Sequence, residues 1–423
     1  MKDLKRREFL GVLGIGVTGA AMPNAARGGK SVSKSNTPAK AVTPPKGRPF
    51  VSGRKDGRFV QTPGFLQQYL KNMRPKLAFD PDMKAEDFPA WREAVRKKLP
   101  EVLCFPEDVP PQPHPKKLWS KQRDGYQLQK WEVYPEPWCV VPFLMLVPNG
   151  VSQQSPAPAV MCFPGSTWSK ESLAGEPELD TGKPIPKRHW ATNRQALFFV
   201  KKGFISVAVE NPATNETASP LRNRSSMCPT ALWLGRNYIG ISVFQKSCIL
   251  EWLSKLPMVD TKRIAACGHS LGSNPADILG VLYPDLVKAV IHNDFLLNWQ
   301  ERAIALNCYS PPIHHTVGGM FQWFDHSDLE ISLAPRPLLF TEGGRKNQID
   351  KIRRAYKLLG AEDQLEVFYY AKYATPEKRP FDDMPLPEGV TMDEYFQYAN
   401  VDAPEHRFRP ERAVPWLTKV FGI

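Results

Sequence analysis

Cysteine is scarce in this sequence of 423 residues, and its spacing is irregular. No C-x-x-C pair occurs, which excludes the common zinc-binding modules, and nothing suggests the framework of a small disulfide-stabilised domain. The irregular spacing is still compatible with a single disulfide. Cys162 and Cys267 lie in apolar, strand-like runs, which predicts thiols packed in a core. The remaining five are Cys104, Cys139, Cys228, Cys248 and Cys308. We expect no metal and no other cofactor.

Long apolar runs and internal repeats are also missing. The uncharged stretch at residues 9–26 contains several glycines and is too short and too mildly hydrophobic to span a bilayer comfortably. It follows Arg6-Arg7, and paired arginines before a short apolar stretch are typical of a twin-arginine export signal. We therefore expect residues 1–26 to direct export of the folded protein to the periplasm or beyond. A short membrane anchor is the alternative.

Positive charge is unevenly distributed along the chain. The formal net charge is +13, but residues 27–60 hold nine basic residues and one acidic residue, and the chain after Gln61 is close to balanced. This distribution argues against a nucleic-acid-binding surface. Residues 27–60 are rich in Gly, Ser, Pro, Lys and Thr, so we expect a disordered basic linker that acts as a solvated spacer. Attraction to an acidic surface is the alternative.

Short apolar runs alternate with helical patterns in the rest of the chain. Residues 61–124 have helical periodicity and predict an N-terminal helical extension, and residues 125–423 predict the main domain. Strands are expected at 126–133, 140–147, 159–163, 204–209, 263–267, 287–291, 337–341 and 365–370, and helices at 239–256, 273–282 and 410–417. This alternation predicts an α/β fold, a mostly parallel sheet with helices on both faces.

The segment Gly268-His269-Ser270-Leu271-Gly272 lies between one of these strands and a helix. A G-x-S-x-G turn in that context holds its serine in a strained backbone conformation and exposes the hydroxyl above the sheet. The flanking glycines are needed because side chains there would clash. We therefore predict that Ser270 is a nucleophile, with a plain tight turn as the alternative.

Three segments resemble the α/β-hydrolase fold and, within it, the acetyl xylan esterase and dienelactone hydrolase group of carbohydrate esterases. They are Phe163–Glu171, Val259–Ile264 before the G-x-S-x-G turn, and Ala334–Leu339. The resemblance covers about residues 65–423. It implies that residues 125–423 are an α/β-hydrolase catalytic domain, and that the protein is a serine esterase for small, acetyl-type esters carried by carbohydrates.

A serine hydroxyl needs a histidine to take its proton and a carboxylate to orient that histidine. In this fold the chain order is serine, acid, histidine. Of the eight histidines, only His406 follows the last predicted strand. Relatives implied by the resemblance carry their catalytic histidine on this loop, so we predict that His406 is the base.

The sequence does not decide which carboxylate orients His406. The resemblance expects an aspartate in the turn where Lys346 and Asn347 stand. We favour Asp294, at the end of a predicted strand, over Glu342, which also ends a strand. Asp350 is weaker because it resembles a residue at a helix N-terminus. Because the acid turn is altered, a non-catalytic binding protein on a hydrolase scaffold is an alternative, as is a peptidase of the same fold.

The resemblance also implies an oxyanion hole and a substrate-binding surface. The backbone N–H groups of Leu271 and Ser166 are the expected oxyanion donors. Trp168 could line the acyl pocket or pack in the core. Trp323 lies in an aromatic insertion at residues 300–333, which suits stacking on sugar rings or a lid packed on the core.

Two further features of the sequence narrow the choice of substrate and metal. Glucuronoyl esterases have an arginine directly after the nucleophile, and Leu271 in that place argues against a uronate ester. A metal held by His314, His315 and His326 lacks a supporting carboxylate spacing. We expect a small-molecule or oligosaccharide ester as substrate, no nucleic acid, and no stable membrane span once the signal is removed.

Overall fold

The computed structural model describes residues 48–179, 191–219, 223–295, 297–307 and 312–423. The expected export signal and residues 27–47 of the expected linker lie outside these residues. The described part of that linker, residues 48–60, contains no helix or strand. No helix in the described ranges is long and apolar enough to cross a membrane.

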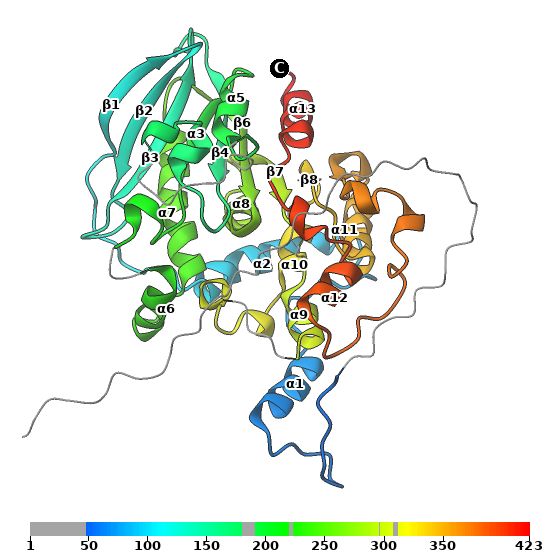
Figure 1. Cartoon of the computed structure of the whole chain (residues 1–423). Helices are drawn as coiled ribbons and strands as arrows, with labels where there is room; N and C mark the ends of the chain where they lie inside the picture. Colours follow the sequence, from blue (N-terminus) through cyan, green and yellow to red (C-terminus); the bar gives the residue numbers. More distant parts are fainter. Residues whose placement is uncertain (1–47, 180–190, 220–222, 296, 308–311) are drawn as a thin grey trace, which may run out of the picture. The chain divides into compact units, whose positions relative to one another are not determined.

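Nine strands in the described residues form one sheet, in the order β1-β2-β3-β5-β4-β6-β7-β8-β9 (Figure 1). They are β1 (Lys116–Arg123), β2 (Tyr126–Val133), β3 (Val141–Pro148), β4 (Ala157–Phe163), β5 (Ile205–Ala208), β6 (Val259–His269), β7 (Val287–Asn293), β8 (Leu338–Phe340) and β9 (Leu365–Val367). Pairing is antiparallel from β1 to β5 and parallel from β5 to β9. The expected mostly parallel sheet is confirmed.

Helices cover both faces of the sheet because its central strands are apolar on both sides. In β4 every side chain is buried, and successive residues point to opposite faces. Met161 packs in a cluster with α2 (Phe88–Val102), α7 (Tyr238–Leu253), α8 (Ser273–Leu282), α10 (His326–Ile331) and α11 (Lys346–Leu358). Cys162 packs on the other face with α3 (Lys170–Ala174), α5 (Gln195–Val200) and α13 (Pro410–Phe421).

The N-terminal extension differs from its prediction at one end. It contains α1 (Thr62–Asn72) and α2, as the helical periodicity indicates, but residues 116–123 form β1 and pair with β2. The expected boundary at residue 124 is therefore wrong, because it separates the two strands of a hairpin. Most β1 side chains are exposed and four of its eight residues are basic, which is usual for an edge strand and hides the apolar alternation.

A third hydrophobic cluster contains many of the aromatic residues that follow β9. It joins α9 (Trp299–Ala305), α12 (Met392–Tyr398) and the segment between β9 and α12. Its buried rings include Tyr370, Tyr395 and Tyr398. Many aromatic residues between positions 373 and 402 thus pack on one another. The remaining described α-helix is α6 (Arg224–Trp233).

The six described cysteines are free thiols. Cys162 and Cys267 are wholly buried on adjacent parallel strands, β4 and β6, which confirms their expected place in the core. Cys308 lies outside the described residues.

Candidate active site

Ser270 occupies a strained turn between β6 and α8. Its φ is +52°, in the left-handed region that a residue with a side chain seldom adopts. A Cβ on Gly268 would clash with the backbone of Gly272, and a Cβ on Gly272 would clash with the carbonyl oxygen of Phe163. Both flanking glycines are thus required by close backbone contacts, and the turn has the geometry of a nucleophile elbow.

His406 and Glu342 form a hydrogen-bonded pair. Glu342 follows β8, and its Oε2 lies 2.6 Å from Nδ1 of His406. The other oxygen, Oε1, accepts the N–H of Arg407 at 3.1 Å and lies 3.6 Å from Nε of Arg409. The Glu342 side chain is fully buried, whereas 22% of the His406 side chain is exposed. The carboxylate is therefore held from two sides, and the imidazole remains accessible.

The electrostatics of the pair follow from this geometry. Burial raises the pKa of the Glu342 carboxyl, but His406 and Arg409 outweigh burial and hold that pKa below its usual value. Burial lowers the pKa of His406, yet the charges of Glu342 and Asp294 prevail and raise it to about 9. The pair thus favours the ionised carboxylate and the imidazolium.

Asp294, the acid favoured by sequence, occupies a different place. Its Oδ1 accepts the N–H of the next residue, Phe295, at 2.7 Å. Within the described ranges no hydrogen bond joins Asp294 to His406, and Glu342 is the carboxylate that does so. Asp294 and Glu342 both follow central parallel strands, so their backbones reach the same edge of the sheet. The structure therefore places the less favoured candidate against the histidine.

The ring of His406 lies beside the elbow. Its centroid is 4.9 Å from that of His269, the residue before Ser270, and 5.3 Å from that of Phe295. Asn293, at the end of β7, holds the loop that carries His406: its Nδ2 donates to the carbonyl of Arg407 at 3.0 Å, and its Oδ1 accepts the N–H of Arg409 at 2.8 Å. The elbow and the His406 loop thus belong to one site.

The loop after β4 packs against the elbow. A Cβ on Gly165 would lie 3.0 Å from Nδ1 of His269 and 3.2 Å from Cδ1 of Trp168. Glycine at this position therefore permits a close approach that larger residues would hinder. Trp168 is 9% exposed and lies at this contact, so the structure supports a wall beside the elbow as well as a packing role.

Two polar side chains that sequence reasoning missed hold the carbonyl groups of this loop. Asn211 Nδ2 donates to the carbonyls of Pro164 and Gly165, at 2.9 and 3.3 Å. Arg224, in the first turn of α6, donates to the carbonyl of Ser166 at 2.7 Å. Asn211 follows β5 in a Glu-Asn-Pro turn, and polar residues just after a buried strand are the signal that points to it.

The altered acid turn begins helix α11. Lys346 pairs with Asp350 at 2.9 Å, and Asn347 Nδ2 lies 3.3 Å from Glu301. Asp350 is therefore an exposed helical residue with an ion-pair partner of its own, and the contacts that hold His406 come from Glu342 instead.

Trp323 does not present a free ring to a sugar. Lys98 Nζ lies 3.7 Å from the centroid of its ring and Lys76 Nζ lies 4.4 Å from it, so lysines of the N-terminal extension cover the ring. The side chain also packs on the core cluster that contains α2 and α10. Of the two alternatives left open by the sequence, this packing favours a lid packed on the core over sugar stacking.

His314, His315 and His326 are largely packed against aromatic rings. The rings of His314 and His315 lie 4.5 Å apart, and Trp299 lies 5.3 Å from His315 and 6.1 Å from His326. Burial lowers the pKa of all three, to about 4 for His314 and about 3 for the other two. These three histidines are therefore neutral near pH 7. The group of His and carboxylate side chains in the described residues that is close enough to hold a metal ion does not include them.

Comparisons with known proteins identify the family of this chain. A model of the Abhydrolase family matches residues 42–419. A crystal structure of a candidate acetyl xylan esterase from Bacteroides fragilis has a TM-score of 0.81 and 35% identity, and the match covers 88% of this chain and 97% of that one. A glucuronoyl esterase from Solibacter usitatus matches with a TM-score of 0.48 and 15% identity, over 68% and 86%. No curated protein matches the chain.

The expected α/β-hydrolase fold and the expected similarity to the acetyl xylan esterase group are thus confirmed. The family match spans the N-terminal extension as well as the sheet, so both parts belong to one family unit. The chain is an esterase-like α/β-hydrolase and belongs to the Abhydrolase family.

Proposed function

We propose that the chain is an exported serine esterase that hydrolyses small, acetyl-type esters carried by carbohydrates. The observation that carries this proposal is the 2.6 Å contact between Glu342 and Nδ1 of His406, beside a strained serine at the elbow. With Nδ1 held by the carboxylate, Nε2 of His406 is the nitrogen left to serve the serine.

The first half of the reaction forms an acyl-enzyme. Oγ of Ser270 attacks the ester carbonyl carbon while Nε2 of His406 takes its proton. The resulting oxyanion accepts hydrogen bonds from the N–H groups of Leu271 and Ser166. The tetrahedral intermediate then expels the alcohol, which takes the proton from His406, and the acyl group stays on Ser270.

The second half returns the enzyme to its starting state. Water attacks the acyl carbon and gives its proton to Nε2 of His406, and the collapse of this second intermediate returns the proton to Oγ of Ser270. The acid product leaves. Glu342 stabilises the imidazolium in both halves, because its ionised form is favoured beside His406.

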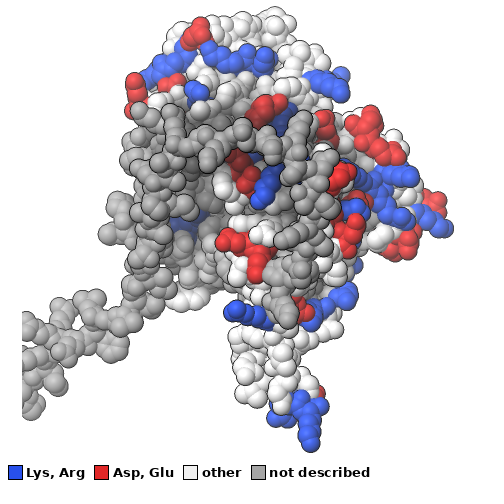
Figure 2. Space-filling view, turned by 45° about the vertical axis from the view of Figure 1, so that its right-hand side comes forward, with Lys and Arg blue, Asp and Glu red and all other residues white. Residues whose placement is uncertain are grey.

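The substrate class rests on similarity and on the residue after the nucleophile. The relative with 35% identity is a candidate acetyl xylan esterase, which supports an acetylated carbohydrate. Leu271 is 2% exposed and carries no charge to pair with a uronate. On the face drawn in Figure 2, basic and acidic side chains of the described residues intermingle.

The first test is hydrolysis of a short-chain aryl acetate, with labelling of the protein by a fluorophosphonate. We expect turnover and labelling in the wild type, and loss of both in Ser270→Ala. Glu342→Gln and Asp294→Asn are a matched pair of acid-to-amide variants, and the larger loss is expected for Glu342→Gln. Acetylated xylan and other acetylated oligosaccharides are screened next.

Two results would overturn the proposal. No turnover together with no labelling of Ser270 would favour a binding protein on a hydrolase scaffold. Cleavage of peptides in preference to acetyl esters would favour a peptidase of the same fold.

Export by the twin-arginine route is tested separately. We expect the full chain to reach the periplasm and the double variant Arg6→Lys, Arg7→Lys to stay in the cytoplasm. Equal export of both would contradict this part of the proposal without bearing on the chemistry.

A further inference from the structure

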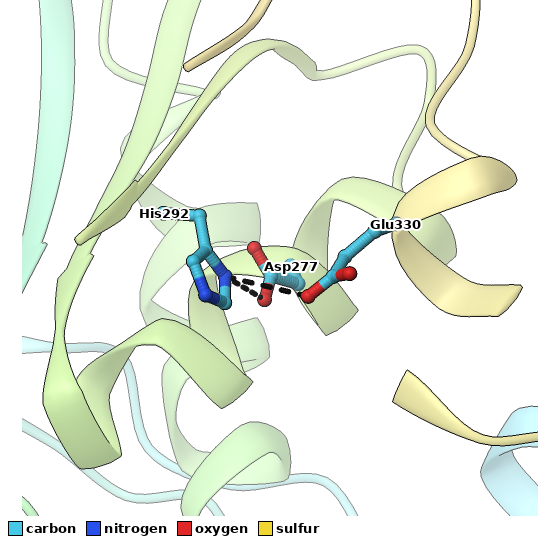
Figure 3. Close-up of side chains that lie close together, drawn as sticks. All are labelled: Asp277, His292 and Glu330. Carbon is cyan, nitrogen blue, oxygen red and sulfur yellow. Dashed lines mark hydrogen bonds and ion pairs between the residues drawn. The ribbon is translucent and has the colours of Figure 1, made fainter. Parts of the chain in front are cut away.

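A second cluster of ionisable side chains lies within the core, between β7, α8 and α10 (Figure 3). Asp277 comes from α8, His292 from β7 and Glu330 from α10, and their side chains point toward one another. His292 is 2% exposed, and both carboxylates are fully buried. None of the three has a part in the proposed ester hydrolysis.

The distances within the cluster match those between ligands of one metal ion. His292 Nδ1 lies 2.8 Å from Oδ2 of Asp277 and 3.5 Å from Oε1 of Glu330. Nitrogen and oxygen ligands lie about 2.0–2.2 Å from a divalent ion such as zinc, so two ligands at angles of about 90–110° are roughly 2.8–3.6 Å apart. Both observed distances fall in this interval.

Several oxygens of the cluster have no hydrogen-bond partner among the described residues. They are Oδ1 of Asp277 and both carboxylate oxygens of Glu330. A buried carboxylate without partners costs several kcal/mol relative to water, and buried polar groups in folded proteins are almost always satisfied. One ligand atom from each of the three side chains lies within 4.8 Å of the others, so a single cation could contact all three side chains.

The surrounding charge is negative. The carboxylates of Asp277 and Asp325 lie near enough to Glu330 to repel its negative charge. His292 is the basic side chain within ion-pair distance of the cluster in the described part of the chain. A single imidazole cannot balance this many acidic groups in a dry core, whereas an ion of charge +2 can.

We propose that Asp277, His292 and Glu330 bind one divalent ion of a first-row transition metal, such as Zn²⁺ or Mn²⁺. The imidazole nitrogen disfavours Mg²⁺ and Ca²⁺, which prefer ligand sets made entirely of oxygen. Both carboxylates can bind through two oxygens, so the three side chains supply up to five donor atoms. Nδ1 of His292 is free to bind the ion when the ring proton is on Nε2.

The ion has a structural role in this position. It joins α8, the helix that follows the nucleophile elbow, to central strand β7 and to α10 in the insertion that follows β7. Sequence reasoning expected no metal, because the cysteines have no zinc-binding spacing and the histidines at 314, 315 and 326 lack a carboxylate at a suitable spacing. Positions 277, 292 and 330 have no recognisable spacing either. Only the fold brings them together.

The competing account is a proton in place of the metal. In that account Glu330 is neutral, Asp277 and His292 form an ion pair, and no ion binds. The two accounts differ in a quantity that can be measured directly, the metal content of the protein.

The test is elemental analysis of the full chain produced in medium that contains both Zn²⁺ and Mn²⁺. We expect about one metal ion per chain in the wild type and at least a tenfold lower content in Asp277→Asn and Glu330→Gln. Glu210→Gln is the matched control, because Glu210 is also a buried carboxylate but pairs with Lys170 elsewhere in the core. It should keep the wild-type metal content.

Thermal unfolding gives a second readout that does not depend on activity. We expect a strong chelator to lower the melting temperature of the wild type by several degrees, and Zn²⁺ or Mn²⁺, but not Mg²⁺, to restore it. Chelation should leave Glu330→Gln unchanged.

Three outcomes would overturn the proposal. They are a metal-free wild type whose melting temperature ignores added metal, equal metal content in the wild type and both ligand variants, and binding of Mg²⁺ in preference to Zn²⁺. If the variants fail to fold, the metal content of the wild type still decides. Because no readout uses ester hydrolysis, a failure here is distinct from a failure of the proposed esterase function.

Discussion

Two histidine–carboxylate pairs in this protein share one local geometry and differ in their access to solvent. His406 contacts Glu342 through Nδ1 at 2.6 Å, and His292 contacts Asp277 through Nδ1 at 2.8 Å. The His406 side chain is 22% exposed and that of His292 is 3% exposed. A histidine that can meet a substrate suits proton transfer, whereas one sealed in the core can only serve the structure. Exposure, more than pair geometry, separates the two roles.

The largest expected effect is that of removing each histidine in turn. His406→Ala should lower kcat for an aryl acetate by about 10⁴-fold, because the serine loses its base. It should lower the melting temperature less than His292→Ala does, because Glu342 keeps its contacts with the N–H of Arg407 and with Arg409. His292→Ala should do the reverse and lower the free energy of unfolding by about 3 kcal/mol or more, since it leaves buried carboxylates unpaired. Kinetics and thermal unfolding of both variants test this prediction. Equal losses of activity in the two variants would contradict the assignment of a catalytic role to His406 and a structural role to His292.

Next in size is the loss of the orienting carboxylate. Glu342→Gln should lower kcat by about 10²–10⁴-fold, because an amide holds the wrong ring tautomer and does not stabilise the imidazolium. It should also move the midpoint of the pH–rate profile to lower pH, since the charge that raises the pKa of His406 is gone. Asp294→Asn is the control, with a smaller loss in kcat and a smaller shift of the midpoint in the same direction. A larger effect of Asp294→Asn on both would assign the acid to Asp294.

The pH dependence of the wild type is the third prediction. In the proposed mechanism His406 acts as the base in its neutral form, and its pKa is raised to about 9. Activity should therefore rise about tenfold per pH unit between pH 7 and 8 and level off near pH 9. Stability should change in the opposite sense: the contribution of the pair is fully present below the usual histidine pKa of about 6.5 and is lost as pH rises through about 9. An activity plateau already reached at pH 6.5 would contradict this.

The smallest expected effect is that of Asp350→Asn. Asp350 is exposed and its partner Lys346 is also exposed, so the pair is screened by water. We expect a change in unfolding free energy within about 0.5 kcal/mol and unchanged kcat. A large loss of activity would mean that the altered acid turn keeps a part in the chemistry.

The sequence predicts the Gly268–Gly272 turn well and the carboxylate that contacts His406 poorly, for a physical reason. The strand, the G-x-S-x-G turn and the helix are neighbours in the chain, so local patterns determine them, and α8 begins and ends where it was expected. Asp294 and Glu342 both follow strands that end at one edge of the sheet, and spacing alone cannot tell which carboxylate faces His406. That choice depends on side-chain packing far apart in sequence.

Other features were missed either because they depend on contacts between distant parts of the chain or because the local pattern is weak. β1 escaped notice because an exposed edge strand rich in lysine lacks the alternation of a half-buried strand. The ring of Trp323 is covered by Lys98 from α2, a contact over more than two hundred residues. The cluster of Asp277, His292 and Glu330 is likewise assembled only by the fold.

Strand β7 ends with His292 and Asn293, and these neighbours point to opposite faces of the sheet. His292 faces the cluster with Asp277, and Asn293 holds the loop of His406. A slip of β7 by one residue against β6 would exchange the two side chains and destroy both sites at once. The pairing register of β7 therefore determines both sites. A chain that pairs β7 in the correct register positions His292 and Asn293 in the same folding step.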